Sequence, residues 1–104
     1  MTAHAKISKI ERLRDRDGST CWFCDQPINF KADPLEDRAP SKEHLIPQCR
    51  DGSDDLENLV LCHRSCNIRL DDLPLVEKIK LRDGVQRRRL LTQLRKRIVP
   101  QLMG

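Results

Sequence analysis

Apolar residues recur with helical spacing in the first part of the chain. Segment 4–16 places three of them three positions apart, which is typical of one face of an amphipathic helix: Ile7, Ile10 and Leu13. Gly18 and Ser19 favour the end of this helix. The pattern therefore predicts an N-terminal helix with a narrow apolar face.

The middle of the chain alternates short apolar runs with turn-forming residues. Segment 25–42 is rich in proline and turn formers, so we expect mostly loop, with one short strand near residues 28–30. Residues 42–47 and 58–62 each predict a short strand. Residues 64–72 can form a helix directly after the second strand. A pair of strands followed by a helix is the expected core.

The C-terminal part returns to helical spacing. Pro74 suits the first turn of a helix over residues 75–83. Gly84 is expected to separate this helix from a last one over 85–99, which Pro100 would end. The last helix has one apolar face: Leu90, Leu91, Leu94 and Ile98.

Length and composition favour one small intracellular domain. The chain has 104 residues and no Gly/Ser-rich linker, so we expect one domain over 1–104. Its parts would be an N-terminal helix (1–20), a central core (21–72) and basic C-terminal helices (73–104). No apolar run approaches the ~20 residues of a membrane span, and no signal-peptide core is visible. We therefore expect a cytoplasmic protein without membrane contact.

Charge is unevenly distributed along the chain. The net charge of +4 divides into +2 for residues 1–17, −5 for residues 18–73 and +7 for residues 74–104. An acidic middle suits bound cations, and basic ends suit a polyanion such as DNA.

Five cysteines indicate a bound metal rather than disulfides, since an odd count in a cytosolic chain argues against a disulfide framework. In CWFC, Cys21 and Cys24 can bring two sulfurs to one Zn²⁺ through a tight turn. By spacing, the second pair is either His63 with Cys66 or Cys62 with Cys66. The first choice mirrors the spacing of CWFC and is favoured.

Four protein ligands would leave no open position for water, so such a zinc would be structural. It would also stabilise a chain too short to bury a large core. Cys62, if it is not a ligand, is expected to be a small buried residue that closes the second strand. Cys49 has no partner at ligand spacing and is expected to be a buried free thiol.

The stretch EHLIPQCRDGSDDLENLVLCHRSCN carries a more specific pattern. It has an acid-His pair, a turn with glycine, Asn-Leu at the second strand and a Cys-rich entry to a helix: Glu43, His44, Pro47, Gly52, Asn58, Leu59, Cys66 and Asn67. This pattern resembles the HNH (ββα-metal) endonuclease family, in an H-N-N variant. CWFC extends the resemblance to residues 21–67, because zinc-stapled members carry such a knuckle.

The resemblance implies a small α+β fold: a two-stranded antiparallel ribbon and a helix around a catalytic cation, stapled by zinc and flanked by N- and C-terminal helices. In the family register, the partner of the last cysteine lies three residues before it. This register implies a zinc site made by Cys21, Cys24, His63 and Cys66.

The resemblance also implies catalytic roles. His44 would be the general base that activates water, since imidazole titrates near neutral pH. Glu43 and Asn67 would hold the catalytic cation, and their oxygens suit Mg²⁺, or Mn²⁺ or Ni²⁺, rather than zinc. Asn58 would support the loop of His44 through hydrogen bonds to backbone. Because adjacent strand residues point to opposite faces, Glu43 and His44 should not form a dyad.

Basic side chains are the expected DNA contacts, made mostly with phosphates. The candidates are Arg64, Arg69, Arg87, Arg88, Arg95 and Lys96. The apolar face of the last helix leaves a dimer open as an alternative use of this segment.

The sequence thus predicts a metal-dependent DNA endonuclease. The main alternative is a non-catalytic zinc module that binds nucleic acid through its basic helices. A zinc-dependent hydrolase is a third interpretation, which requires an open position on the zinc.

Overall fold

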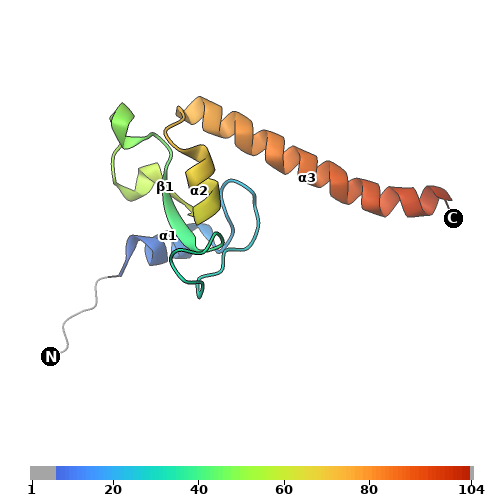
Figure 1. Cartoon of the computed structure of the whole chain (residues 1–104), viewed down its shortest axis with the longest axis horizontal. Helices are drawn as coiled ribbons and strands as arrows, with labels where there is room; N and C mark the ends of the chain where they lie inside the picture. Colours follow the sequence, from blue (N-terminus) through green and yellow to red (C-terminus); the bar gives the residue numbers. More distant parts are fainter. Residues whose placement is uncertain (1–6, 104) are drawn as a thin grey trace.

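A two-stranded antiparallel sheet lies at the centre of the protein, and a short helix follows it directly (Figure 1). The computed structural model describes residues 7–103, with side chains to Ile98. Its elements in chain order are α1 (Lys9–Asp17), β1 (Pro40–His44), two 3-10 turns (Gln48–Arg50 and Leu56–Asn58), β2 (Leu59–His63), α2 (Arg64–Leu70) and α3 (Leu75–Met103). The predicted α+β class is confirmed.

The sheet register places the catalytic candidates at the end of β1. Glu43 pairs with Val60, and His44 pairs with Leu59. β1 ends earlier than the predicted 42–47 because the chain changes partners at Ile46. The backbone N–H and C=O of Ile46 bond to the side chain of Asn58, which replaces a strand partner. The second strand is shifted by one residue from the prediction.

The predicted strand near residues 28–30 is wrong. The backbone N–H of Ile28 donates to Ser19 and that of Asn29 to Arg38, so neighbouring residues bond to different segments and form no ladder. An isolated antiparallel bridge between Thr20 and Pro27 closes the loop that contains CWFC. The first helix also starts later than predicted, at Lys9. Ser8 caps it by accepting a hydrogen bond from the backbone of Glu11; the first six positions lie outside the described residues.

The C-terminal segment is one helix rather than two. α3 continues through Gly84, where the predicted break is wrong, and through position 100, where an end was predicted. A helical glycine costs only about 1 kcal/mol relative to alanine. Leu81 and Val85, on either side of Gly84, both pack against the core. This packing offsets the local preference of glycine.

The core lies between α1, β2, α2 and the CWFC loop. It is built from Leu13, Phe23, Ile28, Leu59, Val60, Leu61 and Leu70 together with Cys21 and Cys62. β2 is buried along its whole length. α3 joins the core through its first part only, where Gln86 donates to the backbone of Trp22 and Phe23. Beyond this point α3 extends away from the rest of the protein (Figure 1).

Candidate metal centre and active-site cleft

Three cysteines and one histidine converge where β2 enters α2. The ligand atoms of Cys21, Cys24, His63 and Cys66 all lie within 4.8 Å of one another. The CWFC turn contributes two of them, the last residue of β2 the third, and the first part of α2 the fourth. Three sulfurs and one imidazole nitrogen are a donor set typical of structural zinc. The cluster can hold such an ion.

The histidine is oriented for this role by its surroundings. Nε2 of His63 lies 2.8 Å from the carbonyl oxygen of Pro27. Because a carbonyl only accepts, Nε2 carries the proton and Nδ1 keeps its lone pair. Nδ1 lies 3.3 Å from the Cys24 sulfur and 3.8 Å from the Cys66 sulfur. Such an outer hydrogen bond is typical of metal-bound histidines.

The thiols in this region are coupled to one another. Hydrogen bonds from the thiols of Cys62 and Cys66 hold the pKa of Cys21 well below its ordinary value, and the backbone N–H of His63 also donates to its sulfur. The hydrogen bond with Cys21 raises the pKa of Cys66, and burial adds to this effect. A cation bound by the cluster would favour the thiolate form of its cysteines, because the thiolate is the form that binds metal.

The two remaining cysteines, Cys62 and Cys49, differ in their exposure to solvent. Cys62 is fully buried in the core and is not part of the four-residue cluster, as the family register implies. Cys49 was predicted to be a buried thiol, and this is wrong. It lies exposed on the first 3-10 turn, because this turn is part of a surface loop.

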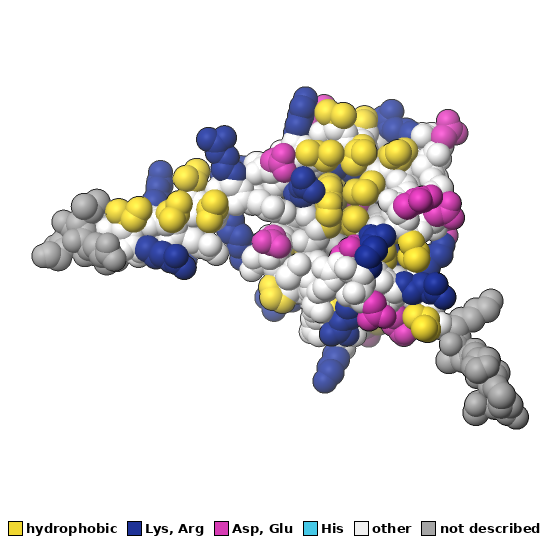
Figure 2. Space-filling model, turned by 180° about the vertical axis from the view of Figure 1, so that it is seen from behind, with side chains coloured by type: hydrophobic (Ala, Val, Ile, Leu, Met, Phe, Trp, Pro, Cys, Tyr) yellow, Lys and Arg dark blue, Asp and Glu magenta, His cyan; other side chains and the backbone are white. Residues whose placement is uncertain are grey.

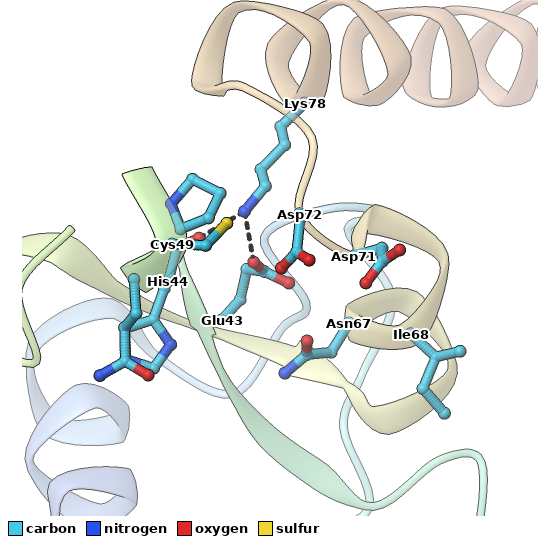
Figure 3. Close-up of a pocket in the computed structure, with 10 residues that line it drawn as sticks. Glu43, His44, Cys49, Asn67, Ile68, Asp71, Asp72 and Lys78 are labelled. Carbon is cyan, nitrogen blue, oxygen red and sulfur yellow. Dashed lines mark hydrogen bonds and ion pairs between the residues drawn. The ribbon is translucent and has the colours of Figure 1, made fainter. Parts of the chain in front are cut away.

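A separate cleft of about 380 Å³ opens between β1, the end of α2 and the start of α3 (Figure 3). Its polar lining comes from both predicted and unpredicted residues. Glu43 and His44 from β1 and Asn67 from α2 were predicted; Asp71, Asp72 and Lys78 were not. The full lining is Glu43, His44, Pro47, Gln48, Cys49, Asn67, Ile68, Asp71, Asp72 and Lys78.

Glu43 is the most buried carboxylate of the cleft. It is 2 % exposed, and its Oε1 accepts a hydrogen bond from Nζ of Lys78 at 2.7 Å. Its Oε2 is buried without a hydrogen-bond partner in the described part of the chain. Burial raises the pKa of Glu43, and the hydrogen bond from Lys78 opposes this. A buried carboxylate oxygen that no donor of the described residues satisfies fits a role as a cation ligand.

Asn67 presents an oxygen to the same cleft. Its Nδ2 donates to Oγ of Ser41 at 2.7 Å and to the carbonyl of Lys42 at 2.9 Å. Both donor bonds therefore go to β1, which leaves Oδ1 as an acceptor. Asp71 lies four residues after Asn67, about one helical turn further on. This spacing in the sequence could have indicated that the carboxylate of Asp71 faces the same side as Asn67. Glu43, Asn67 and Asp71 line the same cleft, and carboxylate and amide oxygens are ligands that suit Mg²⁺ or Mn²⁺.

His44 is held by an acid from the loop between the strands. Its Nε2 lies 3.0 Å from Oδ1 of Asp54. The other oxygen of this carboxylate, Oδ2, lies 2.7 Å from Nζ of Lys9. Lys9 and His44 lower the pKa of Asp54, so this acid is a carboxylate at neutral pH. The carboxylate only accepts, so Nε2 of a neutral His44 carries the proton and Nδ1 can receive another. Glu43 and His44 leave the strand in different directions (Figure 3).

Asn58 holds the loop that follows His44 through hydrogen bonds to its backbone, as predicted from its residue type. Besides its two bonds to Ile46, Asn58 donates to the carbonyl of Ser53 at 2.7 Å. The chain also passes very close to itself here. A Cβ on Gly52 would lie 1.7 Å from the carbonyl oxygen of Ile46, so only glycine fits.

The predicted DNA-contacting residues fall into two groups. Arg64 lies 3.8 Å from the carboxylate of Asp37, and the guanidinium of Arg69 lies 5.1 Å from the centre of the Phe23 ring. These two contact the protein itself. Arg69 is exposed nevertheless, and so are the other four, which lie on α3: Arg87, Arg88, Arg95 and Lys96.

The apolar face of α3 is exposed beside these basic residues. Leu90, Leu91, Leu94 and Ile98 form a row on the projecting part of the helix, with Lys and Arg on either side (Figure 2). Among the described residues, no helix combines the length and apolar character needed to span a bilayer.

Comparison with known proteins agrees with this architecture. Residues 21–71 match the model of the HNH endonuclease family, so this segment belongs to that family of nucleases. The matched segment contains the cysteine-histidine cluster, the sheet and α2, whereas α1 and α3 lie outside it. The comparisons with curated proteins and with solved structures gave no match.

Proposed function

We propose that this protein is a metal-dependent endonuclease that hydrolyses phosphodiester bonds of DNA, with His44 as the general base. The observation that carries the proposal is the cleft itself. It brings together an imidazole, an acceptor amide and a buried carboxylate oxygen that has no hydrogen-bond partner among the described residues. These groups lie within the segment that matches a nuclease family.

The base would act through Nδ1 of His44. Asp54 accepts a hydrogen bond from Nε2–H of His44, which fixes the tautomer and orients the ring. Nδ1 can then remove a proton from an attacking water, and the carboxylate of Asp54 stabilises the imidazolium that results. Asn58 keeps the loop in place on which Asp54 lies.

Glu43 and Asn67 would hold the catalytic cation, with Asp71 and Asp72 as neighbouring acids. A bound Mg²⁺, Mn²⁺ or Ni²⁺ supplies electrostatic stabilisation of the charge that develops on the phosphate and the leaving oxygen. The zinc cluster would not react. Cys66 precedes Asn67 directly, so a zinc ion there would fix the start of α2 and thereby the amide that faces the cleft.

Exposed basic residues of α3 would bind DNA phosphates without reading sequence. A non-catalytic zinc module with the same basic helix is the second candidate. It is favoured by the ion pair of Glu43 with Lys78, because that pair satisfies half of the carboxylate without any metal.

Plasmid cleavage separates the two functions. Zinc-loaded protein is incubated with supercoiled plasmid in EDTA, Mg²⁺, Mn²⁺ or Ni²⁺, and nicked and linear products are measured. We expect cleavage with at least one ion, and a loss of roughly 10²–10⁴-fold in His44→Ala with unchanged zinc content. Binding of plasmid without cleavage in any ion would establish the second candidate. Wild-type rates in His44→Ala would remove His44 as the base.

A further inference from the structure

Lys78 is a buried lysine in a place where a lysine is costly. It is 0 % exposed and lies on α3, outside the segment that matches the nuclease family. Its Nζ donates to Oε1 of Glu43 and to the backbone carbonyl of His44. One ammonium group therefore contacts both adjacent residues to which the proposed function assigns the chemistry (Figure 3).

Stability alone does not account for this pair. A buried ion pair is often no more stable than well-packed apolar residues of similar volume, because both charges lose their hydration. In the part of the chain that the structure describes, the pair also leaves one carboxylate oxygen of Glu43 without a hydrogen-bond partner, which a purely structural pair has no reason to do. The ion pair at Oε1 and the free Oε2 are both explained if Oε2 of Glu43 binds a cation.

The charges of the cleft indicate how Lys78 changes the affinity for a divalent cation. Glu43, Asp71 and Asp72 contribute three negative charges, and Lys78 contributes one positive charge. Lys78 is the group in direct contact with the carboxylate that would bind the cation. A positive charge at this distance repels a divalent cation and cancels part of the attraction of the carboxylate.

We propose that Lys78 is a positioning residue that shares the Glu43 carboxylate with the catalytic cation. It fixes Oε1, so that Oε2 is available to the cleft, and it lowers the affinity of the DNA-free protein for the cation. Tight binding of the cation then requires the additional negative charge of a substrate phosphate. This inference rests on the proposed function of the cleft, and it makes α3 part of the active site.

The test measures Mn²⁺ binding to the full, zinc-loaded chain without DNA, by the electron paramagnetic resonance of free Mn²⁺. We expect Lys78→Met to bind Mn²⁺ at least about tenfold more tightly than wild type, while kcat for plasmid cleavage falls because Oε1 is no longer held. Equal or weaker Mn²⁺ binding by Lys78→Met would overturn the inference. The increase in affinity is a change that a merely structural lysine would not produce.

Lys80→Met is the matched control. Lys80 lies on the same helix and is exposed, so its substitution removes the same charge from α3 without touching the cleft. Its Mn²⁺ affinity should stay within about twofold of wild type, since exposed charges are strongly screened. A gain as large as that of Lys78→Met would show a general charge effect and overturn the specific role.

A measurement on the wild type covers the case in which Lys78→Met does not fold. The buried Nζ of Lys78 is followed by ¹⁵N NMR while Mg²⁺ is added. We expect its signal to shift with saturation and the signal of Lys80 to stay in place; an unchanged Lys78 signal at saturating Mg²⁺ would contradict the shared carboxylate.

Glu43→Gln separates this inference from the function on which it rests. If Glu43→Gln binds Mn²⁺ like wild type, the cleft is not the cation site and the proposed function fails together with the inference. If Glu43→Gln loses Mn²⁺ binding but Lys78→Met does not gain it, only the role of Lys78 fails.

Discussion

The cysteine-histidine cluster and the cleft both take residues from α2, but they are built on different principles. The cluster takes all its ligands from residues 21–66 and closes them within 4.8 Å of one another. The cleft combines oxygen donors of β1 and α2 with a lysine from α3, and it remains open. A closed set of soft donors suits an ion that holds the fold, and an open set of oxygens suits an ion that meets substrate.

The largest effect, on stability as well as on metal content, should come from removing a side chain of the cysteine-histidine cluster. Cys24→Ser removes one of the four side chains of the cluster that could hold zinc. Zinc sites in small domains contribute roughly 10–16 kcal/mol of apparent binding energy, which is as large as the whole stability of a typical small protein. We expect loss of zinc by elemental analysis and loss of the cooperative thermal transition by circular dichroism.

Cys49→Ser is the control for that substitution. Cys49 is exposed and outside the cluster, so zinc content and the transition temperature should match the wild type. A Cys24→Ser protein that folds normally without zinc would show that the cluster is not a structural site.

A smaller effect on cleavage should follow from changing the hydrogen-bond partner of His44, the proposed base. Asp54→Asn keeps the shape of the side chain but removes the carboxylate that orients His44 and would stabilise its protonated form. We expect kcat to fall about tenfold or more, with KM for DNA and zinc content nearly unchanged. Lys9→Met tests whether the effect belongs to Asp54 alone: it removes the other partner of Asp54 and should cost much less. Equal losses of kcat in the two variants would indicate that both disrupt the loop on which Asp54 lies, and not the orientation of His44.

The smallest effect is expected on the projecting part of α3. Replacing exposed Arg87 and Arg88 by Gln should weaken DNA binding a few-fold and reduce the slope of log K against log salt by about 2, if both contact phosphate. Cleavage at saturating DNA should stay close to wild type. The same change at Arg64 and Arg69, which contact the protein itself, should affect stability more than the salt slope. An unchanged slope for the α3 variant would remove this helix from the DNA interface.

Much of the metal cluster could be predicted from sequence, because its information is local. CWFC fixes one pair. Spacing favours His63 over Cys62 as the partner of Cys66, and the register of the family that the chain resembles implies the same choice. The hydrogen bond of His63 to Pro27 could not be predicted, since it depends on how the loop after CWFC folds back.

The cleft was predictable only in part. Glu43, His44 and Asn67 stand in a recognisable order, but Lys78 and Asp54 come from segments that no short motif connects to them. Lys78 was hidden among the basic residues of α3, and only burial distinguishes it from Lys80. The continuity of α3 was missed for a related reason: the contacts of Leu81 and Val85 with the core outweigh the preference of Gly84.

The division of labour between the two sites can be tested by a single titration. Protein purified with its zinc is freed of other cations, and plasmid cleavage is followed as Mg²⁺ or Mn²⁺ is added while zinc content is measured in parallel. We predict that cleavage rises from the background to a plateau with the added ion at constant zinc, and that His44→Ala stays at the background throughout. Cleavage that is complete before any ion is added, and that follows the zinc content instead, would contradict the assignment of structure to the cluster and chemistry to the cleft.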